Sequence, residues 1–279
     1  MISYLQAILL VALQGVAELF PVSSLGHTVL IPAILHWQID TGSDTYLSFL
    51  VLTHLATALV LVVFFWRDWI KIITGVLRSL ARREIAADDT YAKLGWLLIV
   101  GTIPAGILGL LFEEELKTIF ASATVVAIAL MLNGIVLGLA ELMRRRAAEG
   151  AGDDQKLAEM SYVKAVGIGI AQCLALIPGF SRTGLTIGGG LLSGLSHENA
   201  ARFSFLLATP IILAAAVLKG PTLVLSGNDV GEAFVGAAGA AVSAWLSVRF
   251  LVRHFETHTM RPFAIYCAAA GLISLILLH

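Results

Sequence analysis

Residues 14–27 read QGVAELFPVSSLGH, and they place a carboxylate, two hydroxyls and an imidazole inside an apolar region. The apolar run before them, residues 3–17, is too short to cross a bilayer, which takes about 20 apolar residues. An ionised Glu18 at this depth costs at least about 2.5 kcal/mol, so it carries a functional hypothesis. A short helix, a polar break and a second short run at about 28–35 predict a re-entrant hairpin.

The composition indicates a polytopic membrane protein. Of the 279 residues, 58% are hydrophobic and 13% are charged, whereas a soluble domain carries about a quarter charged residues. The net charge of −1 gives no indication of a nucleic-acid partner. The two cysteines, Cys173 and Cys267, lack metal-binding spacing, and we expect both to pack as small hydrophobic residues.

The second half of the chain repeats the pattern. Residues 178–186 read PGFSRTGLT and interrupt the apolar run 162–177, and a short apolar return follows at 187–195. The PVSS of the first break aligns with this PGFS, with a glutamine upstream in each half, Gln14 and Gln172. The shared order and spacing predict an internal duplication.

Each half is predicted as one broken pair followed by three spans. The predicted spans are 46–66, 95–112, 122–142, 199–218, 232–252 and 261–278, with polar segments at 67–94 and 143–161. Because three crossings are an odd number, the second half enters from the opposite side. The fold class is therefore an all-α integral membrane protein, a single domain over 1–279 with inverted repeats at 1–142 and 162–279 and a cytoplasmic linker at 143–161.

The positions of the basic residues are consistent with this topology. Thirteen Lys and Arg lie in the predicted loops of one face (67–94, 143–161 and 249–261) and two in the predicted loops of the other (36–45, 113–121 and 219–231). The positive-inside rule puts the basic face in the cytoplasm and both termini outside. Inverted repeats with broken helices bind their substrate near the midplane, so we expect the two breaks to form one site.

Polar residues of the first break suit chemistry on an anion. Gln14 and Glu18 are four residues apart and share a helix face. Glu18 suits a metal ligand or base with the Gln14 amide assisting, and Gln14 equally suits a structural hydrogen bond. We expect Ser23 to cap the second helix and Ser24 to be the chemical residue, at a helix start that favours anions. His27 would be its base.

Residues of the second break suit phosphate binding. The guanidinium of Arg182 matches phosphate oxygens and keeps its charge when buried. Its alternative role is an ion pair with Glu18, which an empty site would allow. Gly179 permits close backbone approach. The hydroxyl donors of this segment are Ser181, Thr183 and Thr186. His54, in the span 46–66, is a weaker candidate whose core role is at least as well supported.

The two motifs, QxxxExxPVSSxGH at 14–27 and PGxSRxGxT at 178–186, closely resemble those of the bacterial undecaprenyl-diphosphate phosphatase family linked to bacitracin resistance. The chain also has the family's length. The resemblance implies a multi-pass inner-membrane enzyme with inverted repeats and two re-entrant hairpins. It would remove the terminal phosphate of the C55 prenyl diphosphate, a lipid in the bilayer, and regenerate the monophosphate carrier for peptidoglycan synthesis, with its site open to the outer face.

The resemblance also assigns roles. The family's acidic motif falls on Gln14 and Glu18, which would bind a divalent cation, Mg²⁺ or Ca²⁺. Its serine and histidine fall on Ser24 and His27, and its phosphate-binding motif on 181–186. The chain departs from the pattern at Gln14, at Thr183 in place of serine, at His54 in place of glutamine, and after Tyr266, where an arginine is common.

Two hypotheses follow from the residues. In the first, Ser24 attacks the terminal phosphorus while His27 takes its proton, and Arg182 with the cation holds the developing charge; a competing version makes His27 the nucleophile. In the second, the same anion site belongs to a lipid-phosphate transporter or flippase, since inverted repeats with broken helices are also a transporter architecture. The residues leave a homodimer open.

Overall fold

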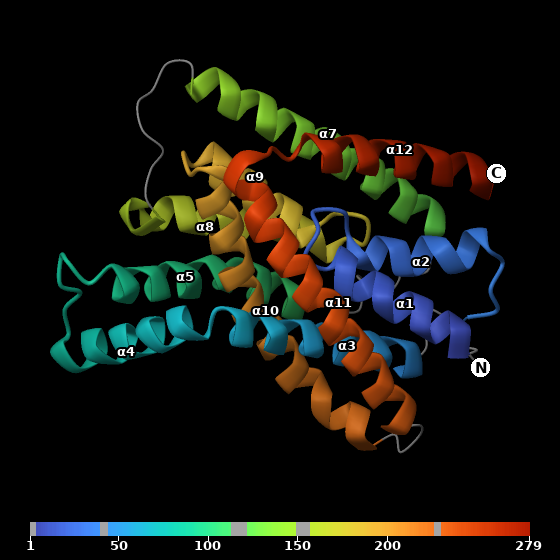
Figure 1. The fold of residues 1–279 in the computed structure, drawn as a ribbon, viewed down its shortest axis with the longest axis horizontal. Helices are drawn as coiled ribbons and strands as arrows, with labels where there is room; N and C mark the ends of the chain where they lie inside the picture. The colour runs from blue at the N-terminus through green and yellow to red at the C-terminus, as the bar shows by residue number, and fades with distance from the viewer. Residues whose placement is uncertain (1–3, 40–43, 113–121, 149–156, 226–229) are drawn as a thin grey trace.

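The computed structural model describes residues 4–39, 44–112, 122–148, 157–225 and 230–279, and every regular element in these ranges is helical (Figure 1). The first half contains α1 (Tyr4–Ala17), α2 (Ser24–Ile34), α3 (Asp44–Phe64), α4 (Trp66–Arg82), α5 (Thr90–Leu111) and α7 (Ala123–Ala148). The second half contains α8 (Tyr162–Cys173), α9 (Arg182–Leu192), α10 (His197–Leu225), α11 (Val230–Thr257) and α12 (Arg261–Leu278), with 3₁₀ turns at Leu157–Glu159 and Leu174–Leu176. The predicted all-α class is confirmed over this part of the chain.

Two pairs of short helices flank the polar breaks. The pair α1 and α2 is separated by residues 18–23, and α8 with its 3₁₀ turn is separated from α9 by residues 177–181. The longest of the four, α1, has 14 residues, about 21 Å at 1.5 Å per residue, which is less than the hydrocarbon thickness of about 30 Å. Each break contains a proline, Pro21 or Pro178, which cannot continue a helix.

Several helices are long and apolar enough to cross a membrane. Among the described residues these are α5, α7, α10 and α12, and the bent pair of α3 and α4 would make a fifth. The predicted span 232–252 lies in α11, which falls short of that apolar character over its described part. A multi-pass membrane protein is thus supported by four or five such helices.

The prediction of a loop at 67–94 was wrong, because most of this polar segment is helical. The helix α4 turns by 83° from the axis of α3, and α5 begins at Thr90 after Asp89, whose side chain accepts the Ala92 N–H at 3.1 Å. Apolar residues recur along α4 at helical spacing between the charges. The predicted linker 143–161 also begins late, since α7 continues to Ala148.

Helix packing relates the two halves reciprocally. The helix α1 packs on α11, and α8 packs on α5. Both contacts are close at a glycine: a Cβ on Gly15 would lie 2.5 Å from the Ala240 oxygen, and one on Gly169 would lie 2.3 Å from the Gly101 oxygen. Small residues at such contacts are typical of membrane helices. The helices α7 and α12 lie side by side, and both chain ends lie at one end of the molecule (Figure 1).

Candidate active site

The two polar breaks are joined by the hydroxyl of Ser23. Its Oγ accepts the N–H of Gly26 at 3.1 Å and the N–H of Gly179 at 3.2 Å, across 156 residues. Ser23 is the N-cap of α2, as predicted, and its φ of 68° is uncommon for a residue other than glycine. One buried side chain therefore starts α2 and also fixes the second break against it.

A second bridge runs through Asn133 of α7, which is fully buried. Its Oδ1 accepts the N–H of Ser181 at 3.0 Å, and its Nδ2 donates to the Pro21 oxygen at 3.4 Å. Ser181 in turn caps α9, since its Oγ accepts the Gly184 N–H at 3.1 Å. Asn133 was not among the predicted site residues, although an amide inside the predicted span 122–142 was an available signal.

At the centre of the site lies the carboxylate of Glu18, which is 7% exposed. Arg182 donates from Nη2 to Oε1, so the ion pair between the two breaks is formed. Ser24 donates from Oγ to Oε2 at 2.5 Å, and His54 Nε2 lies 2.9 Å from the same oxygen. The hydroxyl of Thr183 donates to the Glu18 main-chain oxygen at 2.9 Å. Groups from α2, α3 and α9 thus converge on one residue.

His54 contributes a second positive charge to this cluster. Its Nδ1 lies 2.6 Å from the Leu50 oxygen, and its Nε2 faces the carboxylate. Because carbonyl and carboxylate oxygens only accept hydrogen bonds, both ring nitrogens are assigned as donors. Two cations, Arg182 and His54, surround one carboxylate, and the net charge of +1 favours an anion. His54, the weaker candidate from sequence, therefore lies against Glu18 at the centre of the cluster.

His27 lies away from the hydroxyl that it was predicted to deprotonate. Its Nδ1 is 2.7 Å from the Ser23 oxygen, and its Nε2 is 2.7 Å from the hydroxyl of Tyr266 on α12. The two rings stack at a centroid distance of 5.7 Å. The structure therefore differs from the predicted Ser24–His27 pair, because both ring nitrogens are used elsewhere and the Ser24 hydroxyl points to Glu18.

The remaining residues of the second break have structural contacts. The Thr186 hydroxyl lies 2.5 Å from the Ser204 hydroxyl and donates to the Arg182 oxygen at 2.9 Å. Gly179 has a φ of 106°, and a Cβ there would lie 2.4 Å from the Val126 oxygen of α7. Helix packing therefore requires glycine at position 179. The substrate-binding role of Gly179 and Thr186 stays a prediction.

Gln14 is the one predicted metal ligand with a side chain still available. It is fully buried one helical turn before Glu18, and neither its Oε1 nor its Nε2 has a hydrogen-bond partner in the described structure. Gln172, its counterpart before the second break, is also buried with both atoms unpaired. Buried polar groups are normally satisfied. The described ranges contain no group of three or more His, Cys, Asp or Glu suited to a metal.

Comparisons with known proteins agree with one another. The family model described as bacitracin resistance protein BacA matches residues 7–273. A protein named undecaprenyl-diphosphatase from Mycolicibacterium paratuberculosis is 48% identical, over 99% of this chain and 97% of its own. Undecaprenyl-diphosphatase 2 of Chromobacterium violaceum is 45% identical over 98% of both chains, and the undecaprenyl-diphosphatase of Acidiphilium cryptum is 45% identical over 98% and 97%.

Proposed function

The chain belongs to the family of bacitracin resistance protein BacA, and we propose that it hydrolyses undecaprenyl diphosphate, as the names of its relatives state for them. It releases the terminal phosphate and returns the lipid monophosphate. One observation carries the chemistry: the Ser24 hydroxyl donates to a Glu18 carboxylate that also binds Arg182. A nucleophile, its base and a phosphate-binding cation are thus held in one buried cluster.

In the proposed mechanism Ser24 is the nucleophile. Its Oγ attacks the terminal phosphorus as its proton passes to Glu18, and the bond from that phosphorus to the bridging oxygen breaks. The lipid monophosphate leaves with the proton that Glu18 took from Ser24, which restores the carboxylate. Water then attacks the phosphoserine while Glu18 takes one of its protons, and Glu18 passes that proton to the Ser24 oxygen as its bond to phosphorus breaks. Arg182 moves from the carboxylate to the phosphoryl oxygens, where the amides at the start of α9 also face the charge.

His27 is the less favoured nucleophile on geometric grounds. Its Nδ1 is engaged by the Ser23 carbonyl and its Nε2 by Tyr266, so an attack would first need one of these bonds to break. We assign His27 and Tyr266 to a hydrogen-bonded pair that orients the start of α2, and Ser24 to the covalent step.

A divalent cation, Mg²⁺ or Ca²⁺, fits this site only together with the substrate. Gln14 Oε1 and the Glu18 carboxylate are hard oxygen donors of the kind that both ions prefer, and Gln14 Oε1 has no other partner in the described structure. Two protein oxygens are few for either ion, so the diphosphate and water would complete the shell. Once bound, the ion would neutralise charge on the transferred phosphoryl group.

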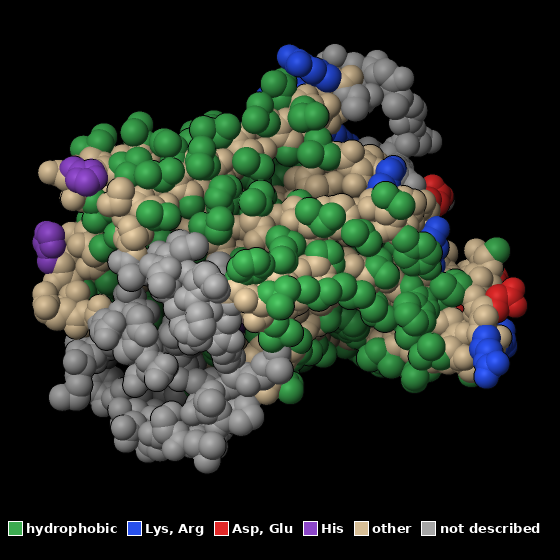
Figure 2. Space-filling model, turned by 180° about the vertical axis from the view of Figure 1, so that it is seen from behind, with side chains coloured by type: hydrophobic (Ala, Val, Ile, Leu, Met, Phe, Trp, Pro, Cys, Tyr) green, Lys and Arg blue, Asp and Glu red, His purple; other side chains and the backbone are tan. Residues whose placement is uncertain are grey.

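We also propose that the two halves are inverted repeats and that α1–α2 and α8–α9 are re-entrant hairpins. The reciprocal packing of α1 on α11 and of α8 on α5 supports this arrangement. On the face seen in Figure 2, Lys and Arg gather at one end, His lies at the other, and hydrophobic side chains cover the middle. By the positive-inside rule both termini face outward across the bacterial inner membrane, and the homodimer stays a prediction.

Lipid transport was the alternative, and it is not favoured. The relatives are named as diphosphatases, and a serine hydroxyl bonded to a buried carboxylate is an arrangement that hydrolysis uses and transport does not require. The test is release of inorganic phosphate from C55 prenyl diphosphate by the purified protein in detergent with Mg²⁺ or Ca²⁺. If the wild type releases none, the enzyme proposal fails.

Variants then assign the roles. Ser24→Ala is expected to abolish both phosphate release and a trapped phosphoenzyme, and Glu18→Gln to slow release about 10²–10⁴-fold as the base is lost. The matched control is Ser247→Ala, which removes a buried hydroxyl bonded to the Ser243 oxygen within α11. A phosphoenzyme that persists in Ser24→Ala, with the label on His27, would reverse the assignment of the nucleophile.

A further inference from the structure

The helix α4 packs beside the beginning of α5 and is joined to the beginning of α10 by one ion pair (Figure 1). At its centre a Cβ on Gly75 would lie 2.7 Å from the N atom of Ala92, in the first turn of α5. Near its start, Arg202 in the second turn of α10 donates to Asp68 at 2.8 Å. Because α5 and α10 are both apolar enough to span the membrane, α4 is fixed at the level where these spans begin. That level is the end of the molecule with the basic segments.

The surface of α4 is divided into three faces. One face is buried: Ile72, Gly75 and Ser79. A second is an exposed apolar stripe, which consists of Trp66, Ile70, Ile73, Leu77 and Leu80, each between 51% and 60% exposed. A third is a basic stripe, which consists of Arg67, Lys71, Arg78 and Arg82. At 100° per residue the apolar and basic stripes lie roughly 140° apart, which is typical of a helix lying in a membrane interface.

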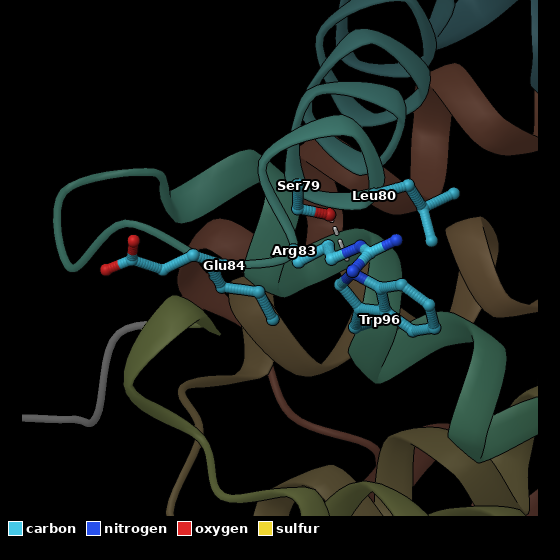
Figure 3. A pocket seen from close by; sticks show the side chains of 6 residues that line it. Ser79, Leu80, Arg83, Glu84 and Trp96 are labelled. Carbon is cyan, nitrogen blue, oxygen red and sulfur yellow. Dashed lines mark hydrogen bonds between the residues drawn. The ribbon is translucent and has the colours of Figure 1, made fainter.

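A pocket of about 270 Å³ opens where α4 ends and the chain turns toward α5 (Figure 3). The turn is made by Arg83, whose φ is 53°. The pocket is lined by Ser79, Leu80, Arg83, Glu84, Ile85 and Trp96. In the view of Figure 3 the Arg83 side chain extends toward Trp96 on the same pocket wall, whereas the Glu84 carboxylate points away from it.

The depth and chemistry of this pocket suit the head group of a lipid. Trp96 is six residues into α5, about 9 Å along the helix, and its Nε1 donates to Ser79 Oγ at 3.0 Å; tryptophan prefers this interfacial level. A cation beside apolar walls matches a phosphate that carries acyl chains. The ammonium of a zwitterionic lipid would face Arg82 and Arg83, so charge complementarity favours a lipid with net negative charge.

We propose that α4 lies in the membrane interface and that the pocket at its end binds the head group of an anionic phospholipid, with Arg83 on the phosphate. The apolar stripe of α4 then contacts the acyl boundary and its basic stripe the surrounding head groups. This surface is separate from the Glu18 cluster, and the proposal does not rest on the phosphatase activity.

The test uses the full chain in vesicles in which brominated acyl chains are carried either by phosphatidylglycerol or by phosphatidylcholine. Bromine quenches nearby indoles, and the Trp96 contribution is the difference between wild type and Trp96→Phe. We expect stronger quenching by the brominated phosphatidylglycerol, and a loss of that preference in high salt. Each basic residue near an anionic surface is worth roughly a fivefold change in partition, so Arg83→Gln should lower the preference about fivefold.

The matched control is Arg145→Gln, which removes the same charge from the exposed end of α7. It should leave the Trp96 preference unchanged. Glutamine and arginine have similar backbone preferences, so the substitution does not change the strain at the positive φ of residue 83. Phosphate release by Arg83→Gln checks that the variant is folded. Equal quenching by the two lipids, or an equal loss in Arg83→Gln and Arg145→Gln, would overturn the proposal.

Discussion

Substituting Gly179 by alanine tests the closest approach between the second break and α7. The residue has a φ of 106°, and an added Cβ would lie 2.4 Å from the Val126 oxygen and 2.8 Å from the Leu130 nitrogen. Both are backbone atoms, so no side chain can rotate away. The alanine must therefore change the backbone conformation of the break or displace α7.

The two effects set the size of the loss. Holding a residue other than glycine at such a φ costs about 1–3 kcal/mol, and forcing an extra methyl into a packed interior costs about 1–3 kcal/mol more. Gly179→Ala should therefore destabilise by about 2–6 kcal/mol, a large share of a net stability of about 5–15 kcal/mol. The same movement would lengthen the hydrogen bond from the Gly179 N–H to Ser23 Oγ, in which nitrogen and oxygen are 3.2 Å apart in the intact site.

The assay is thermal unfolding of the purified protein in detergent, followed by size exclusion after heating and by phosphate release. Unfolding of membrane proteins is often irreversible, so all variants are compared at one heating rate. The control is Gly167→Ala in α8, where a Cβ would meet nothing within 4 Å and helix propensity should stabilise by up to about 1 kcal/mol. A Gly179→Ala protein as stable and active as Gly167→Ala would refute the packing argument.

Three further substitutions test the cluster itself. Tyr266→Phe removes the hydroxyl that bonds His27 Nε2 and should lower kcat about 2–10-fold, the effect of losing one hydrogen bond. In a double variant with His27→Gln it should add little further loss. Fully additive losses in the kinetics of the double variant would contradict the pairing. His54→Gln keeps a donor toward Glu18 but removes one charge, so KM should rise about tenfold with a smaller change in kcat; an unchanged KM in steady-state assays would contradict the charge argument. Gln14→Leu should raise the free energy of unfolding by about 1–3 kcal/mol, because it removes two unpaired polar atoms. It should also raise the Mg²⁺ concentration needed for half-maximal activity. A cation titration unchanged from wild type would exclude Gln14 as a ligand.

Most of the fold could be predicted because the bilayer imposes a simple rule on the sequence. Apolar runs interrupted at Pro21 and Pro178 gave the short helix pairs, and the predicted span 261–278 coincides with α12. The interpretation failed at 67–94, where charges concealed a helix whose apolar residues recur at Trp66, Ile70, Ile73 and beyond. An interfacial helix is mixed in composition, so a search for long apolar runs passes over it.

The charged residues of the site could be predicted from the sequence, because a buried charge stands out in an apolar segment. A carboxylate and a guanidinium buried in a membrane need partners, and the ion pair with Glu18, which the sequence offered as the alternative role of Arg182, is formed in the structure. The positions of His54, Asn133 and Tyr266 were not predictable in this way. Each lies on a long helix whose rotation is set by packing against its neighbours, and a rotation of one residue would turn the side chain away from the site.

Arg182 binds Glu18 through Nη2, and a phosphate that competes for this guanidinium would link substrate binding to the chemical step. In the structure the carboxylate shares its two oxygens among Arg182, His54 and Ser24. When a diphosphate draws the guanidinium away, Oε1 loses its ion pair and the carboxylate is left with the serine hydroxyl and the imidazolium. Within the proposed mechanism, Glu18 therefore becomes a stronger base for Ser24 when the phosphate arrives, because one of its two cationic partners has been drawn away.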